Sequence, residues 1–185
     1  MKKNNKIKKT PIRTVLLMRH GKSEWEDESI PDFERALAPR GRSDSPVMGR
    51  FLRKAGKIPD LIISSPAKRA KSTAELVAKA CGYKKDIVFE ESVYENSCGE
   101  IINVLQELDD TINTVLIIGH NPSIEDTVKK LIFREIRNSE NGIKVPTAAI
   151  ACLETEAKFW SELYPGDCTI SWFVTPRLVS QVGAN

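Results

Sequence analysis

The sequence contains few of the residues that bind metals or form disulfides. It has two histidines and four cysteines in 185 residues, and the cysteines lie far apart, with no CxxC pair. Structural zinc sites take their ligands from closely spaced cysteines and histidines. The sequence therefore predicts neither a metal site nor a cofactor, and we interpret the cysteines as reduced thiols of a cytoplasmic protein.

Long hydrophobic runs are also missing. No apolar stretch is long enough to cross a membrane, and the lysine-rich start of the chain lacks the apolar segment of a signal peptide. Internal repeats and low-complexity linkers are absent too. We therefore expect no membrane partner and a single folded domain of ordinary size.

Positive charge is concentrated in one short segment. The net charge is +3, and residues 1–9 hold five lysines and no acidic residue, which leaves 23 basic and 25 acidic residues elsewhere. That near balance excludes a basic nucleic-acid-binding domain. We predict that residues 1–10 form a flexible basic tail and that residues 11–185 form the domain. Contact between the tail and an acidic partner is the alternative.

Apolar runs alternate with helical patterns along the chain. This alternation predicts a three-layer α/β/α sandwich around a mostly parallel sheet, with two late strands antiparallel at one side. Glycines at positions 56 and 82 are expected to end the first two helices. Strands are expected at residues 14–18, 60–64, 87–89, 114–118, 148–153 and 169–174, and helices at residues 47–55, 70–81, 101–108 and 124–132.

Both histidines follow predicted strands, at the edge where open α/β sheets bind their ligands. Arg19 and His20 follow the first strand, and His120 follows the third long strand. Arg69 lies one turn into the helix after the second strand. Because a guanidinium presents a planar fork of donors to phosphate oxygens, this set predicts a phosphate pocket. A neutral imidazole kept unprotonated by positive neighbours would attack phosphorus there and form a phosphohistidine.

Three motifs carry a family resemblance. RHG after the first strand, SSPAKRAKSTA after the second and GHNPS after the third resemble the histidine phosphatase superfamily, also called phosphoglycerate mutase-like, over residues 14–176. The segments MRHGKSEWED, DFERALAPRGR, PTAAIACLE and TPR resemble its SixA-type phosphohistidine phosphatase branch, as does the lack of room for a cap domain. The resemblance implies a phosphoglycerate mutase-like fold without a cap domain.

The resemblance also implies roles for the residues at the strand ends. His20 matches the nucleophile, and His120 matches a phosphate ligand that stabilises the transition state. Arg19 and Arg69 match two phosphate-binding arginines. Arg35, in ERALAPRG, matches an arginine of a loop that can face the substrate, although alanine replaces the usual proline after it.

Three further residues are candidates for contact with the substrate. Ser23 would either donate to the phosphate or cap a helix. Asn121 precedes a helix whose N-terminal N–H groups favour an anion. Glu95 would either protonate a leaving oxygen or mark the start of a helix.

These observations predict a metal-independent phosphohydrolase that acts through a phosphohistidine on His20. A general acid contributes about 10²–10⁴-fold to a rate, and cleavage of a P–N bond depends on it less than cleavage of an alkyl phosphate does. The predicted substrate is therefore a phosphorylated partner, namely a phosphohistidine-bearing signalling protein. The alternatives are a small-molecule phosphomonoesterase and a phospho-ligand-binding regulatory module with weak turnover.

Overall fold

The computed structural model describes residues 12–94, 97–134 and 142–183. The tail predicted at residues 1–10 and the candidate acid Glu95 lie outside the described residues. No helix within these three ranges is long and apolar enough to span a membrane.

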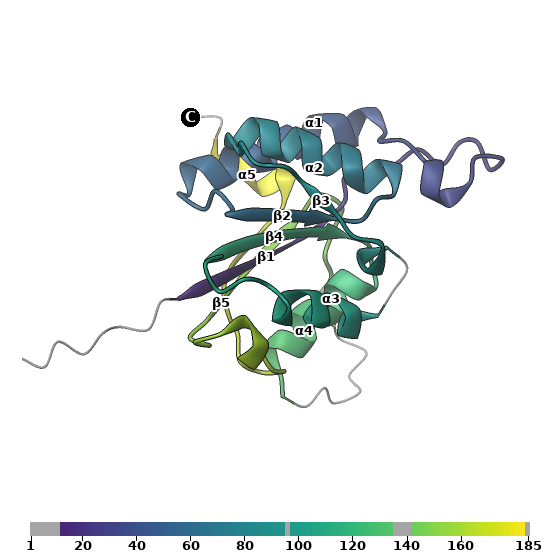
Figure 1. Ribbon diagram of the computed structural model, residues 1–185. Coiled ribbons are helices and arrows are strands. Elements are labelled where there is room, and N and C mark those ends of the chain that lie inside the picture. The colour runs from purple at the N-terminus through teal and green to yellow at the C-terminus, as the bar shows by residue number, and fades with distance from the viewer. Residues whose placement is uncertain (1–11, 95–96, 135–141, 184–185) are drawn as a thin grey trace, which may run out of the picture.

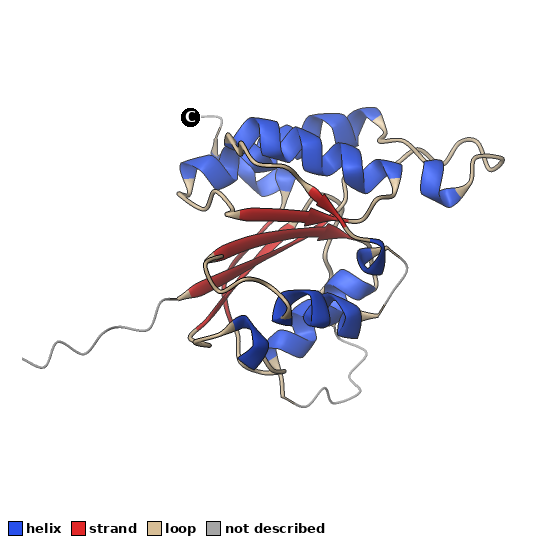
Figure 2. Cartoon of the chain, in the orientation of Figure 1, coloured by secondary structure: helices blue, strands red, loops and turns tan. Residues whose placement is uncertain are grey.

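A six-stranded sheet forms the middle layer, in the order β3-β2-β4-β1-β5-β6 (Figure 2). Strands β3, β2, β4 and β1 pair in parallel, whereas β5 runs antiparallel to β1 and β6 runs antiparallel to β5. The predicted mostly parallel sheet with two late antiparallel strands is thus confirmed. The strands are β1 (Arg13–Arg19), β2 (Leu61–Ser64), β3 (Val88–Phe89), β4 (Thr114–Gly119), β5 (Ile150–Thr155) and β6 (Thr169–Val174).

Helices cover both faces of this sheet (Figure 1). On one face lie α1 (Pro39–Lys54), α2 (Lys68–Cys81) and α5 (Pro176–Val182), and on the other lie α3 (Cys98–Gln106) and α4 (Ser123–Ile132). Short 3-10 helices at Asp32–Glu34, Glu91–Val93 and Trp160–Glu162 complete the connections. The three-layer sandwich predicted from the sequence is therefore the fold of the protein.

The two central strands, β1 and β4, lie between two hydrophobic cores. Successive side chains of a strand point to opposite faces, so Val15 and Leu17 enter one core while Leu16 and Met18 enter the other. The side chains of β4 divide between the cores in the same way. A strand that is apolar on both faces needs helices on both sides, which is why these two runs predict a buried parallel sheet.

Helix α1 begins earlier than the sequence pattern predicts. The apolar spacing indicates a start near residue 47, but the helix begins at Pro39, a residue that suits the first helical position. The buried residues of its first two turns are Gly41 and Ser45, which carry no hydrophobic signal. A side chain at Gly21 would meet both of them within 3.1 Å. The small residues thus let α1 pack closely against the loop that carries His20.

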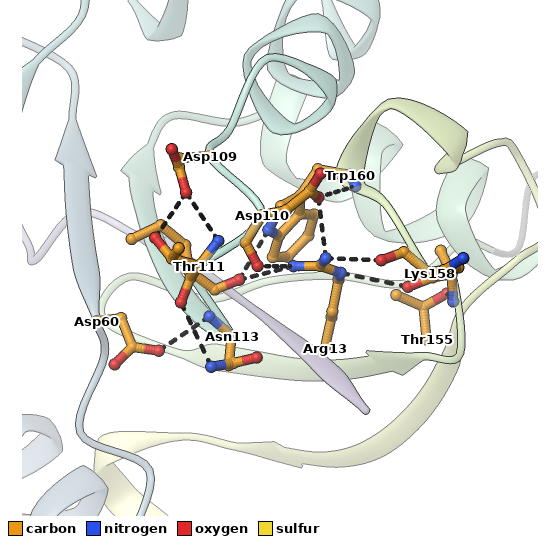
Figure 3. Close-up of polar contacts among 11 residues, drawn as sticks. Arg13, Asp60, Asp109, Asp110, Thr111, Asn113, Thr155, Lys158 and Trp160 are labelled. Atoms are coloured by element: carbon orange, nitrogen blue, oxygen red, sulfur yellow. Dashed lines mark hydrogen bonds and ion pairs between the residues drawn. The ribbon is translucent and has the colours of Figure 1, made fainter. Parts of the chain in front are cut away.

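A buried arginine, Arg13, begins β1 at the end opposite to His20 (Figure 3). Arg13 is 2% exposed, and its guanidinium lies 5.1 Å from the ring of Trp160. It donates hydrogen bonds to the Asp110 carboxylate and to four carbonyl oxygens, those of Asp110, Ile112, Ala157 and Lys158. These bonds tie the connections that follow α3 and β5 to the start of the central strand.

Candidate active site

A cavity of about 760 Å³ opens at the carboxyl ends of β1, β2 and β4. This volume is in the range of small-molecule binding sites. The lining residues come from the ends of these strands and the segments after them, from the first 3-10 helix, and from the connections before α3 and before β5. They are Arg19, His20, Lys22, Ser23, Trp25, Asp32, Arg69, Tyr94, Ser97, His120, Asn121, Pro122, Ser123 and Thr147.

The two histidines lie side by side because their strands pair in register. Arg19 at the end of β1 is opposite Gly119 at the end of β4. The residue that follows each strand is a histidine, so the centroids of the His20 and His120 rings are only 4.9 Å apart. Both side chains are nearly buried, with 7% and 8% exposure. The sheet itself therefore fixes the distance between the rings.

The hydrogen bonds of His20 determine which ring nitrogen carries the proton and which carries the lone pair. Its Nδ1 lies 2.7 Å from the carbonyl oxygen of Gly21, which can only accept, so Nδ1 carries the proton. The lone pair is then on Nε2, where it accepts a hydrogen bond from Arg69 Nε at 3.3 Å. Nε2 of a neutral ring is the atom required of a nucleophile.

Burial keeps this ring neutral. Desolvation by burial lowers the pKa of His20 to about 4, the Gly21 hydrogen bond opposes the shift, and the charges of Arg69 and Arg19 add to it. The sequence prediction attributed the neutral ring to the nearby positive charges alone. They act in the predicted direction, but burial is the larger cause because the strand places the ring inside the molecule.

His120 is held in the complementary tautomer. Its Nδ1 accepts a hydrogen bond from Arg69 Nη2 at 3.1 Å, since a guanidinium can only donate. Its Nε2 then donates to Ser65 Oγ at 2.8 Å. Burial, followed by the proximity of His20 and Arg69, lowers the pKa of His120 to about 3. Both imidazoles are therefore neutral at physiological pH.

Arg69 connects the two rings to the wall of the cavity. Its guanidinium bonds both imidazoles, and its Nη2 also donates to Asp32 Oδ2 at 2.7 Å. Its Nη1 donates to the backbone oxygen of Asp32. The first turn of α2 positions the side chain, which is 7% exposed.

Arg19 lies on the other side of His20 with much of its hydrogen-bonding capacity unused. Its Nη1 donates to the carbonyl oxygen of Val145 at 3.2 Å. Its buried Nε donates to none of the residues that the structure describes. An unfilled guanidinium donor that lines a cavity beside a neutral imidazole suits an oxyanion such as phosphate.

A comparison with protein families classifies this arrangement. The model of the histidine phosphatase superfamily (branch 1) matches residues 15–111, which is more than half of the chain. The chain belongs to the histidine phosphatase superfamily. The predicted family and the predicted class of enzyme, a phosphatase, are confirmed.

Sequence similarity to other proteins extends over most of this histidine phosphatase. An uncharacterised protein of Mycobacterium tuberculosis is 29% identical over 166 residues, which are 86% of this chain and 100% of that protein. An uncharacterised chloroplastic protein of Arabidopsis thaliana is 28% identical over 177 residues, which are 89% of this chain and 78% of that protein.

Solved structures share the fold of the phosphatase. The protein histidine phosphatase SixA in complex with tungstate matches with a TM-score of 0.75 and 24% identity, over 90% of this chain and 99% of that one. A candidate SixA from Nakamurella multipartitia matches with a TM-score of 0.77 and 23% identity, over 89% of this chain and 96% of that one. The predicted phosphoglycerate mutase-like fold of the SixA type is confirmed.

Two other predicted site residues, Ser23 and Asn121, also lie at the cavity. Ser23 is buried and lines the cavity, but no helix begins there, and its Oγ accepts a hydrogen bond from Trp25 Nε1 at 3.0 Å. Asn121 also lines the cavity, but its amide N–H groups donate to Glu125 and to the Val145 carbonyl. These bonds orient the loop of Asn121, and the predicted contact of the following helix N-terminus with an anion stays a prediction.

Arg35 supports the wall of the cavity instead of lining it. Its guanidinium lies 4.1 Å from the centroid of the Trp25 ring, and its Nη1 lies 3.8 Å from Asp32 Oδ1. A direct contact with substrate, the prediction for this residue, would need the Trp25 stacking to open. Glu95 is outside the described residues, so its role as the acid stays a prediction.

Four contacting residues were not predicted from the sequence. Asp32 accepts a hydrogen bond from Arg69, and the Tyr94 hydroxyl donates to Asp32 Oδ2 at 3.1 Å. Ser65 orients His120, as described above, while Thr73 accepts the Gly21 N–H at 3.0 Å. Three of the four lie within the motifs SSPAKRAKSTA and DFERALAPRGR, so a signal for them existed. The sequence around Tyr94 offers none.

Proposed function

We propose that this histidine phosphatase is a phosphohistidine phosphatase that works without a metal through a covalent phosphohistidine on His20. The observation that carries the proposal is the unprotonated Nε2 of a neutral, buried His20, which hydrogen-bonds Arg69 in a cavity lined by Arg19 and Arg69. Among the described residues, no group of three metal-binding side chains lies close enough to hold a metal ion.

The reaction follows from this geometry in two steps. Nε2 of His20 attacks phosphorus, and the electron pair of the bond that breaks goes to the departing nitrogen. A water molecule then attacks the phosphorus of the phosphohistidine, which releases inorganic phosphate and returns the neutral imidazole. Arg19 and Arg69 balance the charge on the phosphoryl oxygens in both steps.

The carboxylate in the cavity supports a P–N substrate. Burial raises the pKa of Asp32, but the hydrogen bond and charge of Arg69, with Tyr94 and Arg35, outweigh burial and leave the pKa below its usual value. An ionised carboxylate does not supply the proton that an alkoxide leaving group requires. An imidazole that is protonated on its second ring nitrogen needs no such donor, because it leaves as a neutral ring. The SixA structure, named a protein histidine phosphatase, supports the same substrate class.

Phosphate release tests this proposal directly. Wild-type protein is incubated in EDTA with a phosphohistidine peptide, a phosphoserine peptide and p-nitrophenyl phosphate. We expect the highest kcat/KM with phosphohistidine and a loss of about 10³-fold or more with all three in His20→Ala.

A trapping experiment supplies the control for folding. His120→Ala should slow turnover but still form an acid-labile, alkali-stable phosphoenzyme, whereas His20→Ala should form none. Equal release by His20→Ala and wild type would refute the nucleophile. A wild-type preference for phosphoserine would identify a phosphomonoesterase instead, and no release from any substrate would favour a binding module.

A further inference from the structure

Asp32 places a negative charge in a cavity that otherwise suits an anion. Arg19 and Arg69 line the same cavity, and the side chain of Asp32 is 40% exposed there. A carboxylate in the same cavity opposes the binding of a phosphate dianion, because like charges repel each other most strongly where water is partly excluded. We therefore looked for a role of Asp32 that requires its negative charge.

Holding Arg69 in place uses only one oxygen of the carboxylate. The backbone oxygen of Asp32 already accepts a hydrogen bond from Arg69 Nη1. Of the two carboxylate oxygens, Oδ2 is occupied by Arg69 and the Tyr94 hydroxyl. Among the described residues, Oδ1 accepts no hydrogen bond and faces Arg35 Nη1 only at 3.8 Å. Oδ1 is therefore an unfilled acceptor on the cavity wall.

We propose that Asp32 is a specificity-determining residue that accepts a hydrogen bond from the N–H of the leaving imidazole and so selects phosphohistidine over phosphate esters. The inference rests on the proposed function, because it concerns the leaving group of the same reaction. Arg69, Arg35 and Tyr94 fix the carboxylate in position. The departing group must therefore approach Asp32, and not the reverse.

The chemistry of the leaving ring explains the selection. When its second nitrogen is protonated, the phosphorylated imidazole is a cation, and Nε2 of His20 can displace it as a neutral imidazole. When that nitrogen is unprotonated, the ring must leave as an imidazolate, a much poorer leaving group. A nearby carboxylate raises the pKa of the ring and so increases the protonated fraction. An ester oxygen carries no N–H and gains nothing from Asp32.

The test compares Asp32→Asn and Asp32→Glu with wild type on a phosphohistidine peptide, a phosphoserine peptide and p-nitrophenyl phosphate. Asp32→Asn should lower kcat/KM for phosphohistidine about tenfold, the equivalent of one pKa unit. The two esters should change less than threefold, and Asp32→Glu should keep most of the preference. Glu34→Gln is the matched control, since it neutralises an exposed carboxylate in the same 3-10 helix.

The pH profile separates this role from positioning of Arg69. The deficit of Asp32→Asn should grow as the pH rises from about 6 to about 8, because an imidazole with an ordinary pKa near 6.5 loses its proton over that range. His20 and His120, with pKa values of about 4 and 3, do not titrate there. Of the groups that contact Asp32, Arg69 and Arg35 stay charged, and Tyr94 is a phenol.

Each result has one meaning. An equal loss of kcat/KM on all three substrates in Asp32→Asn would show that Asp32 only positions Arg69. A larger loss on phosphoserine would show that Asp32 donates a proton. Either result overturns the inference. The substrate preferred by wild type tests the proposed function separately. If wild type prefers phosphoserine but Asp32→Asn still loses selectively on phosphohistidine, the proposed function fails and the inference stands. If wild type prefers phosphohistidine and the preference is unchanged in Asp32→Asn, only the inference fails.

Discussion

Arg13 and Arg69 are both buried arginines, and they lie at opposite ends of the sheet. All five N–H groups of the Arg13 guanidinium are used, four by backbone carbonyls and one by Asp110. Arg69 instead bonds two imidazoles and the Asp32 side chain, together with one backbone oxygen. Carbonyls fixed in the backbone make a structural clamp, whereas side-chain partners can be exchanged for a phosphate. The partners of a buried arginine, more than its burial, indicate its task.

The largest effect is expected for Arg69→Met. The variant removes a cation from the phosphate site and the donor shared by both imidazoles, so kcat/KM should fall by about 10³-fold. The free energy of unfolding should fall less than in Arg13→Met, because His20, His120 and Asp32 line the cavity, where water can replace the lost donor. Initial rates with p-nitrophenyl phosphate and urea denaturation measure the two quantities.

Lys68→Met is the matched control, since Lys68 is exposed at the first position of the same helix. More than a tenth of wild-type activity in Arg69→Met would show that the bridge between the imidazoles is dispensable.

Arg13→Met should give the opposite result. Five hydrogen-bond acceptors lose their donor, so we expect the free energy of unfolding to fall by about 3 kcal/mol. The kcat/KM should stay within about twofold of wild type while the protein is folded, because the cavity is at the other end of β1. Urea denaturation measures the first value and a rate at low temperature the second. Arg53→Met, at an exposed position near the end of α1, is the control. Unchanged stability would contradict the clamp.

A third effect concerns pH and again distinguishes the two ends of the sheet. His20 and His120 have folded pKa values of about 4 and 3, below the unfolded value of 6.5. Between these limits the unfolded chain binds more protons, so the free energy of unfolding falls as the pH is lowered from about 6.5. Each histidine contributes a slope of about 1.4 kcal/mol per pH unit.

Thermal or urea denaturation from pH 7 to pH 5 measures this slope. His20→Gln should lose part of it, whereas Arg13→Met should keep all of it, because an arginine does not titrate in this range. The same slope in His20→Gln as in wild type would contradict the neutral, buried ring.

The sequence predicts most of the fold and the centre of the site, but little of the cavity wall. β1 and β4 are easy to identify because both their faces are apolar, and a histidine follows each strand. The first turns of α1 are not, because their buried positions are Gly41 and Ser45. The helix is defined there by the close contact with the loop of Gly21, which leaves no hydrophobic pattern.

The wall could not be predicted because its contacts join distant segments. Asp32 meets Arg69 across 37 residues and Tyr94 across 62, through short 3-10 helices that have no periodic signal. The orientation of the Ser23 and Asn121 side chains could not be predicted either. The direction of a hydroxyl or amide depends on neighbours such as Trp25 and Glu125, which only the folded chain brings close.

The register between β1 and β4 has a consequence for how the chain tolerates rearrangement. The two imidazoles meet because Arg19 pairs with Gly119, and a slip of one residue would turn one ring to the opposite face of the sheet. A single residue inserted within β4 should therefore give a protein that is inactive even if it folds. A circular permutant whose new termini lie at the end of the sheet near Arg13 should keep the two imidazoles together, provided that β1 and β4 keep their register.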